Sequence, residues 1–292
     1  LRRSLWCFRQ EACCYSIRVR LKSLMGFCQL LKKASLVGAF FVPAIWLSTA
    51  RAEVFCPAPA TLARVEVQRV VDGDTVRLKD GRSVRMIGIN APETARKGRA
   101  DEPFAIAARQ RLEALVAASD GRVGLVPGRE SQDRYGRTLA HLYGANGENL
   151  EAQLLAEGLG FQVGVAPNVD LVPCQQAAEN AARQARLGIW RQSPVQTVAQ
   201  LKRSGFAVVS GRVSKIERNR GGIWIELQGA LVLRIASDQA SQFDAAMLKG
   251  LQGRVIEARG WVQDRSRHGG LKKPQARWLL PLTDPGMLKS IP

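Results

Sequence analysis

Residues 70–93 read VVDGDTVRLKDGRSVRMIGINAPE, and this stretch decides the fold of the first half of the chain. Apolar Val, Leu, Met and Ile alternate with polar residues on both sides of Asp80-Gly81. Alternation of this kind is typical of half-buried strands, and Asp-Gly is the strongest short signal for a hairpin with a two-residue turn. The stretch therefore predicts two paired antiparallel strands.

The register of this hairpin would bring charges to its buried face. A two-residue turn pairs Val76 with Arg85 and makes Asp74 a diagonal neighbour of Arg85 on the apolar side. A buried acid and base are costly unless they pair or bind something. Pro92 ends the strand, and Glu93 adds a third charge at this point. Two interpretations stay open, a structural salt bridge and a binding site at the rim of the sheet.

The pattern of apolar residues along the rest of the chain predicts two β-rich units in tandem. In the first unit we expect strands within 63–89 and at 122–126 and 137–143, and helices at 103–117, 148–157 and 174–187. Residues 193–205 predict a linker or a short helix. In the second unit we expect strands at 206–217, 223–228, 230–236, 253–263 and 276–282, with a helix at 237–251. Ser237 or Asp238 would cap that helix.

The expected fold class is mainly β with α (α+β). The order of strands and helix in the second unit is that of an OB-fold, a small Greek-key barrel. The first unit is compatible with a small barrel decorated by helices.

The chain has 292 residues and a formal net charge of +18, which favours polyanionic partners such as nucleic acid or an anionic membrane. Only two histidines occur, His141 and His268, without HExxH or CxxC spacing. The sequence therefore gives no support for zinc chemistry or a hydrolase triad.

The N-terminal segment has the layout of a secretory signal peptide. The first methionine is Met25, Lys32 and Lys33 precede an apolar run over 34–47, and Ala50-Arg51-Ala52 is a small-x-small cleavage motif. We expect residues 1–24 to lie upstream of the true start and residues 25–52 to be removed. An uncleaved membrane anchor is the alternative, although the apolar run is short for a spanning helix.

Cleavage after Ala52 would leave 34 basic and 24 acidic residues, so the mature chain would keep a net charge of +10. It would also leave two cysteines, Cys56 and Cys174. Two thiols in an oxidising compartment suggest one disulfide, which would tie the mature N-terminus to a later helix. Two unpaired buried thiols are the alternative.

The motifs VDGDT, VRMIGINAPE and DRYGR, followed by GLGF and APN at 158–168, resemble the thermonuclease (staphylococcal nuclease-like) family. The resemblance runs from about Arg64 to Trp190, and the motifs are specific in combination. It implies a five-stranded OB-type barrel with helices, dependence on Ca²⁺, and hydrolysis of phosphodiester bonds in DNA and RNA.

The resemblance also implies roles for single residues. Asp74, Asn90 and the backbone carbonyl of Ala91 match the calcium ligands, and oxygen donors suit this hard ion. Arg85 and Arg137 match the arginines that contact the scissile phosphate, and guanidinium groups bind phosphoryl oxygens bidentately. Glu93 matches the general base that activates the attacking water.

Two departures from the family pattern bear on these roles. Asn90 stands where the best-known member has an aspartate, so one negative charge is lost and weaker calcium binding is expected. The segment at 158–168 lacks the tyrosines of the nucleotide pocket, although Phe161 is available for stacking and Tyr135 is a candidate nucleotide contact. A protein that binds nucleic acid without efficient hydrolysis therefore stays open as an alternative, as does a structural envelope protein.

The second unit has basic loops where an OB-fold binds its ligands. Candidate nucleic-acid contacts lie in these loops and on the adjoining strands: Arg218, Arg220, Trp224, Trp261, Arg265, Arg267, Lys272 and Lys273. Aromatic residues next to basic loops are typical of single-strand binders. Solvated charges and core tryptophans are the alternative interpretation.

These observations together predict an exported, calcium-dependent endonuclease acting on DNA or RNA, periplasmic or secreted and monomeric, with no stable protein partner. The expected division of the chain is an extension at 1–24, a signal peptide at 25–52, a thermonuclease-like domain at 53–190, a linker at 191–205 and an OB-like domain at 206–292.

Overall fold

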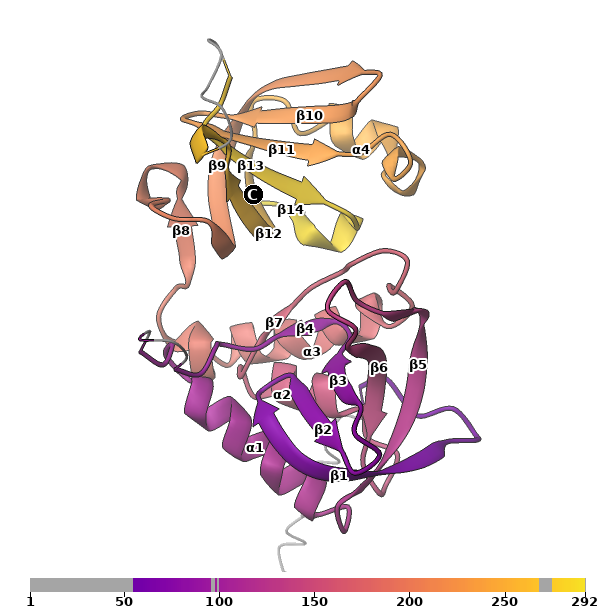
Figure 1. Cartoon of the computed structure of the whole chain (residues 1–292). Coiled ribbons are helices and arrows are strands. Elements are labelled where there is room, and N and C mark those ends of the chain that lie inside the picture. Colours follow the sequence, from indigo (N-terminus) through magenta and orange to yellow (C-terminus); the bar gives the residue numbers. More distant parts are fainter. Residues whose placement is uncertain (1–54, 96–97, 99, 268–274, 292) are drawn as a thin grey trace, which may run out of the picture. The chain divides into compact units, whose positions relative to one another are not determined.

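The structure is a computed structural model that describes residues 55–95, 98, 100–267 and 275–291, the side chain of Arg267 excepted (Figure 1). The expectations for the extension, the signal peptide and its cleavage fall on residues 1–52, and those for Lys272 and Lys273 on 268–274. All of them lie outside the described residues. Among the helices that are described, none is long and apolar enough to cross a bilayer.

The first unit is a closed barrel in which the strands follow the ring order β1-β2-β3-β6-β5. The barrel strands are β1 (Ala63–Asp72), β2 (Thr75–Leu78), β3 (Ser83–Met86), β5 (Arg122–Gln132) and β6 (Thr138–Tyr143). The indigo and magenta arrows of Figure 1 trace this ring. Strands β1, β2 and β3 are antiparallel neighbours, and β3 closes onto β6 in parallel. This is the expected OB-type barrel.

Three helices and a small ladder accompany the barrel in the described part of this unit. The helices are α1 (Ala105–Ala117), α2 (Leu150–Ala156) and α3 (Val172–Gln184). Helix α1 buries Ala108, Leu112 and Leu115, which recur at helical spacing, and packs against β1. The ladder pairs β4 (Ile89–Asn90) with β7 (Phe161–Gln162), a strand that alternation does not reveal because it has two residues.

The predicted hairpin forms, but its register is wrong by one residue. Thr75 pairs with Arg85 and Val76 with Val84, because the loop after β2 has three residues instead of two. The third loop residue, Gly81, has a φ of 90°, which glycine adopts at little cost. Val76 and Val84 point into the core, so Arg85 lies on the opposite face of its strand.

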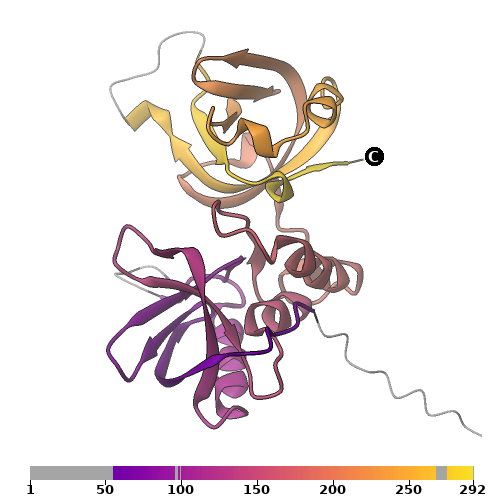
Figure 2. The same cartoon turned by 90° about the vertical axis from the view of Figure 1, so that its right-hand side faces the viewer.

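The second barrel has the ring order β9-β10-β11-β13-β12, closed by pairing of β12 with β9. Its strands are β9 (Gly205–Asn219), β10 (Gly222–Leu227), β11 (Leu231–Ile235), β12 (Val255–Asp264) and β13 (Trp278–Leu282). Two short strands, β8 (Val195–Thr197) and β14 (Leu288–Ser290), extend the sheet. The orange and yellow arrows of Figure 2 trace this barrel, which confirms the predicted strand order.

The helix predicted over 237–251 is shorter, and its predicted cap is wrong. Helix α4 (Ala245–Lys249) begins after Asp244, whose carboxylate accepts a hydrogen bond from the N–H of Ala246 at 2.9 Å. Phe243, which is buried in the core of the second barrel, has extended backbone and interrupts the helix. The preceding turn η3 (Ala240–Gln242) is separate. Burial of Phe243 therefore overrides the capping signal at Ser237 and Asp238.

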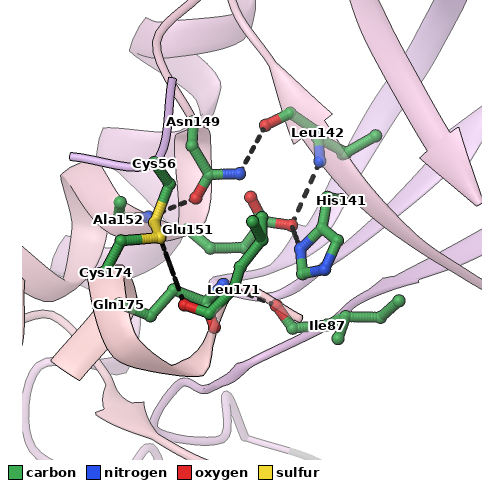
Figure 3. The surroundings of a disulfide bond; sticks show 10 residues. All are labelled: Cys56, Ile87, His141, Leu142, Asn149, Glu151, Ala152, Leu171, Cys174 and Gln175. Carbon is green, nitrogen blue, oxygen red and sulfur yellow. Dashed lines mark hydrogen bonds and ion pairs between the residues drawn. A yellow bond between two sulfur atoms is a disulfide. The ribbon is translucent and has the colours of Figure 1, made fainter. Parts of the chain in front are cut away.

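The predicted disulfide joins Cys56 to Cys174, with Cα atoms 5.3 Å apart and a sequence separation of 118 (Figure 3). It ties the segment before β1 to α3. Near it lies a buried polar cluster, in which Glu151 accepts a hydrogen bond from the N–H of Leu142 and lies 3.4 Å from Nδ1 of His141 (Figure 3). His141 is a buried residue of β6, as the strand interpretation predicted.

Candidate active site

Asp74 lies in the tight turn between β1 and β2, at one end of the first barrel. Gly73 makes this turn possible, because a Cβ atom there would come within 2.6 Å of Ala108 in α1 and 2.7 Å of Ala91. The Asp74 carboxylate is buried and accepts hydrogen bonds from the N–H of Ala91 at 2.9 Å and from the hydroxyl of Thr75 at 3.0 Å. The turn thus fixes the carboxylate against α1 and the segment after β4.

Arg85 reaches this carboxylate from β3. Its Nη1 lies 2.6 Å from Oδ2 of Asp74, and its Nη2 donates to Oδ1 of Asn90 at 3.3 Å. The predicted pair exists, although the reasoning from a shared strand face was wrong. Asp74 belongs to a turn, where alternation does not set the direction of a side chain, and the long Arg85 side chain reaches it from the other face of its strand.

Burial dominates the electrostatics of Asp74. Loss of solvation raises the pKa of its carboxyl to about 7, even though the Arg85 guanidinium lowers it, and the neighbouring Asp72 raises it further. Asp72 is also buried and accepts a hydrogen bond from the N–H of Asp74 at 3.3 Å. Burial and the nearby Asp72 carboxyl therefore outweigh the effect of the Arg85 guanidinium on Asp74. Such a group is characteristic of functional sites.

Arg137 follows the turn between β5 and β6 and precedes Leu139, the parallel partner of Arg85, by two residues. Arg137 thus directly precedes the strand that pairs with the strand of Arg85. Asp133 holds Arg137 in place, accepting a hydrogen bond from its Nε at 2.7 Å and from its backbone N–H at 3.0 Å. Tyr135, in the same loop, is 69% exposed, and the Arg137 guanidinium lies 5.7 Å from its ring centre.

Glu93 is exposed after the end of β4. Its backbone N–H donates to the Glu102 carboxylate at 3.1 Å, and its carbonyl accepts from the N–H of Glu102 at 2.9 Å. In the described part of the chain, no contact joins the Glu93 carboxylate to Asp74 or Arg85. The structure therefore fixes the Glu93 backbone, and the role of its carboxylate stays a prediction.

The oxygens of this site fit a hard cation. Carboxylate and amide oxygens of Asp74 and Asn90 already share one positive charge, the Arg85 guanidinium. A further cation would relieve the cost of an ionised Asp74. No cluster of three or more His, Cys, Asp or Glu side chains suited to a metal occurs among the described residues, so the site would depend on amide and carbonyl oxygens as well.

A chain of contacts connects the strand that carries Asn90 to the second barrel. Gln162 pairs with Ile89 in the β4–β7 ladder, and its carbonyl accepts a hydrogen bond from Nη1 of Arg259 in β12 at 3.1 Å. The same nitrogen donates to both carboxylate oxygens of Glu179 in α3, each at 2.7 Å. All these groups are buried. The ladder beside the site is therefore held from both barrels.

The candidate contacts of the second barrel lie in two places. Trp224 on β10 donates from Nε1 to Asn219 at 3.1 Å, and the Arg234 guanidinium lies 5.3 Å from its ring centre. The exposed Arg218 and Arg220 lie at the adjoining turn between β9 and β10.

Trp261 pairs across the sheet with Phe206 at the opposite end of β9, and its side chain is 40% exposed. The alternative interpretation, in which Trp261 is a core residue, is therefore wrong. Arg265 lies at the end of β12, where its Nη1 donates to the Ala276 carbonyl at 3.4 Å. The side chain of Arg267 lies outside the described residues. The two groups of candidates do not form one cluster.

Sequence reasoning assigned no role to Asp133, Asp72 or Arg259. The Asp133-Arg-Tyr-Gly-Arg137 motif offers a signal, since an aspartate just before a glycine turn commonly bonds the backbone that follows. Asp72 was visible as the first acid of VDGDT. Arg259 has no local signal, because its partners are remote in sequence.

Comparison with known proteins places the first barrel among nucleases. The model of the family described as staphylococcal nuclease homologue matches residues 83–192. A thermonuclease from Staphylococcus intermedius is 35% identical over 127 residues, which are 42% of this chain and 74% of that protein. Endonuclease YhcR of Bacillus subtilis (strain 168) is 32% identical over 138 residues, but these make up only 11% of its length. An uncharacterized endonuclease of Escherichia coli O157:H7 is 28% identical over 127 residues.

Proposed function

Because the chain belongs to the staphylococcal nuclease homologue family, we propose that it is an exported, calcium-dependent endonuclease that hydrolyses phosphodiester bonds of DNA or RNA. The observation that carries this proposal is the buried Asp74 carboxylate, 2.6 Å from Arg85, with Asn90 on the same guanidinium. A salt bridge that served only stability would not need Asn90 on the same guanidinium, nor a second arginine, Arg137, at the start of the neighbouring strand.

In this proposal Asp74, the amide oxygen of Asn90 and the carbonyl of Ala91 hold a calcium ion. When bound, the ion supplies positive charge that polarises the phosphate and orients water. The N–H of Ala91 and the hydroxyl of Thr75 keep the Asp74 carboxylate in one orientation for this task. The same packing excludes water from the Asp74 side of the site.

Arg85 and Arg137 bind the non-bridging oxygens of the phosphate and stabilise the charge that develops in the transition state. Asp133 fixes the Arg137 guanidinium through the hydrogen bond that it accepts from Nε. Glu93 accepts the proton of the attacking water, and its exposed position allows substrate and water to enter.

Export is supported by two independent features. The segment at 25–52 has the layout of a signal peptide, and the disulfide between Cys56 and Cys174 is typical of an oxidising compartment. We therefore place the working protein in the periplasm or outside the cell, as a monomer, with an uncleaved anchor as the alternative.

The test is digestion of a labelled oligonucleotide by purified residues 53–292, with calcium and with chelator. Cleavage should require calcium, and Arg137→Ala and Glu93→Gln should each lower kcat by about 100-fold or more. Arg129→Ala is the matched control, since Arg129 forms an exposed ion pair with Asp170 nearby, and should change kcat less than twofold. Calcium-independent cleavage, or full activity of both variants, would refute the proposed site.

A second candidate function is binding of nucleic acid without efficient hydrolysis, which the missing negative charge at Asn90 favours. The loops of the second barrel would serve either function. Arg218→Gln with Arg220→Gln should weaken oligonucleotide binding and make it less sensitive to salt, because fewer phosphates of the strand are then neutralised by the protein. Strong binding by the unchanged chain without any cleavage would favour the second candidate function. An unchanged affinity of the double variant at low salt would show that these loops do not bind nucleic acid in either function.

A further inference from the structure

A pocket lies outside the proposed active site, where the unit that contains the first barrel ends. It has a volume of about 370 Å³ and is lined by residues of 183–195, among them Arg183, Arg186, Arg191, Trp190 and Ser193. None of the proposed catalytic residues belongs to this described lining, and none of its side chains is acidic. The pocket therefore offers hydrogen-bond donors and positive charge.

The local backbone brings the three arginines together. Helix α3 ends at Gln184, and Arg186 adopts a left-handed conformation with a φ of 53°. The chain then enters the short turn η1 (Gly188–Arg191), so Arg191 follows the reversal and Arg183 precedes it. The end of a helix and the turn that reverses it thus form the walls of one pocket.

Arg183 is fixed by its surroundings. Its guanidinium lies 3.9 Å from the ring centre of Trp190, and its two terminal nitrogens donate to the Glu257 carboxylate at 2.6 and 3.2 Å. The charge of Arg183 is therefore largely compensated. Arg186 and Arg191 are exposed, and within the described ranges no carboxylate pairs with either of them. They supply the uncompensated charge of the pocket.

Trp190 provides an independent observation. The side chain is only 8% exposed, and its indole Nε1–H has no hydrogen-bond partner in the part of the chain that is described. Buried indole N–H groups usually find an acceptor, because leaving one unpaired is costly. Trp190 lines the pocket beside Arg186 and Arg191, so an anion that reached the indole N–H would satisfy it and offset the two arginines.

We propose that this pocket binds a phosphate group, and that the group is a backbone phosphate of a nucleic-acid strand away from the bond that is cut. The identity of the strand rests on the proposed function, whereas the preference for phosphate rests on the pocket. Arg186 and Arg191 contact its oxygens, and Trp190 donates the N–H that has no acceptor among the described residues. The pocket would hold a strand whose scissile bond lies at Asp74.

The test follows the indole N–H of Trp190 by ¹H–¹⁵N NMR in the whole chain with chelator present, and Trp190→Phe identifies its resonance. Inorganic phosphate is titrated in one arm and a single-stranded 12-mer in the other. Both should shift the resonance. Arg186→Gln with Arg191→Gln should weaken binding of the 12-mer about tenfold and lower its salt dependence, and Trp190→Phe should weaken it less, since the ring under Arg183 is kept.

The matched control removes two exposed charges elsewhere, by Lys249→Gln with Arg254→Gln, and should change affinity less than twofold. Arg137→Ala should keep the shift of the Trp190 resonance even where cleavage is lost. A failure of the catalytic proposal can therefore be distinguished from a failure of the phosphate site. A shift with inorganic phosphate alone would overturn the strand as the source of the phosphate. An unmoved resonance in both arms, or a double variant no weaker than its control, would overturn the site.

Discussion

The two barrels have the same ring order of strands, with a helix between the third and the fourth, but Asp74 in the first has a pKa shifted in the opposite direction from those of Asp264 and Glu257 in the second. In the first barrel, burial raises the pKa of Asp74 to about 7. In the second, hydrogen bonds from Arg277 and Ser266 hold the pKa of Asp264 well below its usual range. Burial also raises the pKa of Glu257, but bonds from Arg183 and Arg259 outweigh it and leave that pKa lowered.

This difference in pKa shift distinguishes a candidate binding site from ion pairs that stabilise the fold. Asp264 is paired with Arg277, and Glu257 with Arg183 and Arg259. These ion pairs hold strands and loops together. Asp74 shares a single guanidinium with Asn90 and has a second acid beside it. The same strand order thus carries a buried carboxyl with a raised pKa in one barrel and carboxyls with lowered pKa values, paired with arginine, in the other.

The largest effect should come from the disulfide, which lies in the first unit alone. Replacing Cys56 and Cys174 by alanine should lower the free energy of unfolding of that unit by about 4–5 kcal/mol, since the bond closes a long loop. Hydrogen exchange under mild denaturant should show faster opening of core amides in the first barrel and little change in the second. An equal loss in both would show that they unfold as one unit.

Matched substitutions of arginine test the contrast between the barrels directly. Arg85→Lys keeps a charge for Asp74 but loses the planar fork, so kcat/KM on a short labelled oligonucleotide should fall about 100-fold. Arg277→Lys makes the same change beside Asp264 and should leave kcat/KM within about twofold. Similar losses in both variants would mean that the effect is structural.

A charge can be restored at the candidate cation site. Asn90→Asp should tighten calcium binding about tenfold, because a second carboxylate joins Asp74. Isothermal titration measures this, and Asn168→Asp, at a buried asparagine of another loop, is the control. Equal or weaker binding in Asn90→Asp would show that residue 90 is not a ligand.

The smallest effect is on the pH dependence of stability without metal. The folded chain raises the pKa of Asp74 from its ordinary 3.8 to about 7, so Asp74 stabilises the fold fully below about pH 4, and this stability is lost as the pH rises to 7. The melting temperature of Asp74→Asn should therefore fall less between pH 4 and 7 than that of the unchanged chain.

Glu257 has a lowered pKa, so its stabilisation is present above its ordinary 4.5 and lost as the pH falls through the folded value. The melting temperature of Glu257→Gln should therefore fall less than that of the unchanged chain as the pH drops below 4.5.

Local patterns were sufficient for most of the fold. Alternation around Asp80-Gly81 and helical spacing in α1 predicted elements that the structure has, because each pattern reflects a surface packed on one core. The hairpin register could not be predicted, since the choice between a two-residue and a three-residue loop depends on the packing of Val76 and Val84. The two-residue strands β4 and β7 are too short to carry a period.

The site was predicted in part. Asp74, Arg85 and Asn90 lie together as the motifs indicated, and Arg137 directly precedes the strand that pairs with the strand of Arg85. Nothing local could reveal Arg259, whose partners Gln162 and Glu179 come from remote segments. The direction of the Asp74 side chain likewise depends on a turn that Gly73 allows, and strand logic does not extend to it.

The Arg259 guanidinium has a consequence for trimming the protein. A fragment that stops at Trp190 would lose the cation that donates to both oxygens of the buried Glu179 and to the Gln162 carbonyl. Glu179 would then lose half of the positive charge that balances it. This loss would loosen β7, and with it the backbone that aligns Asn90. We therefore expect a fragment that ends at Trp190 to hold β7 and Asn90 less firmly than a chain that includes the second barrel.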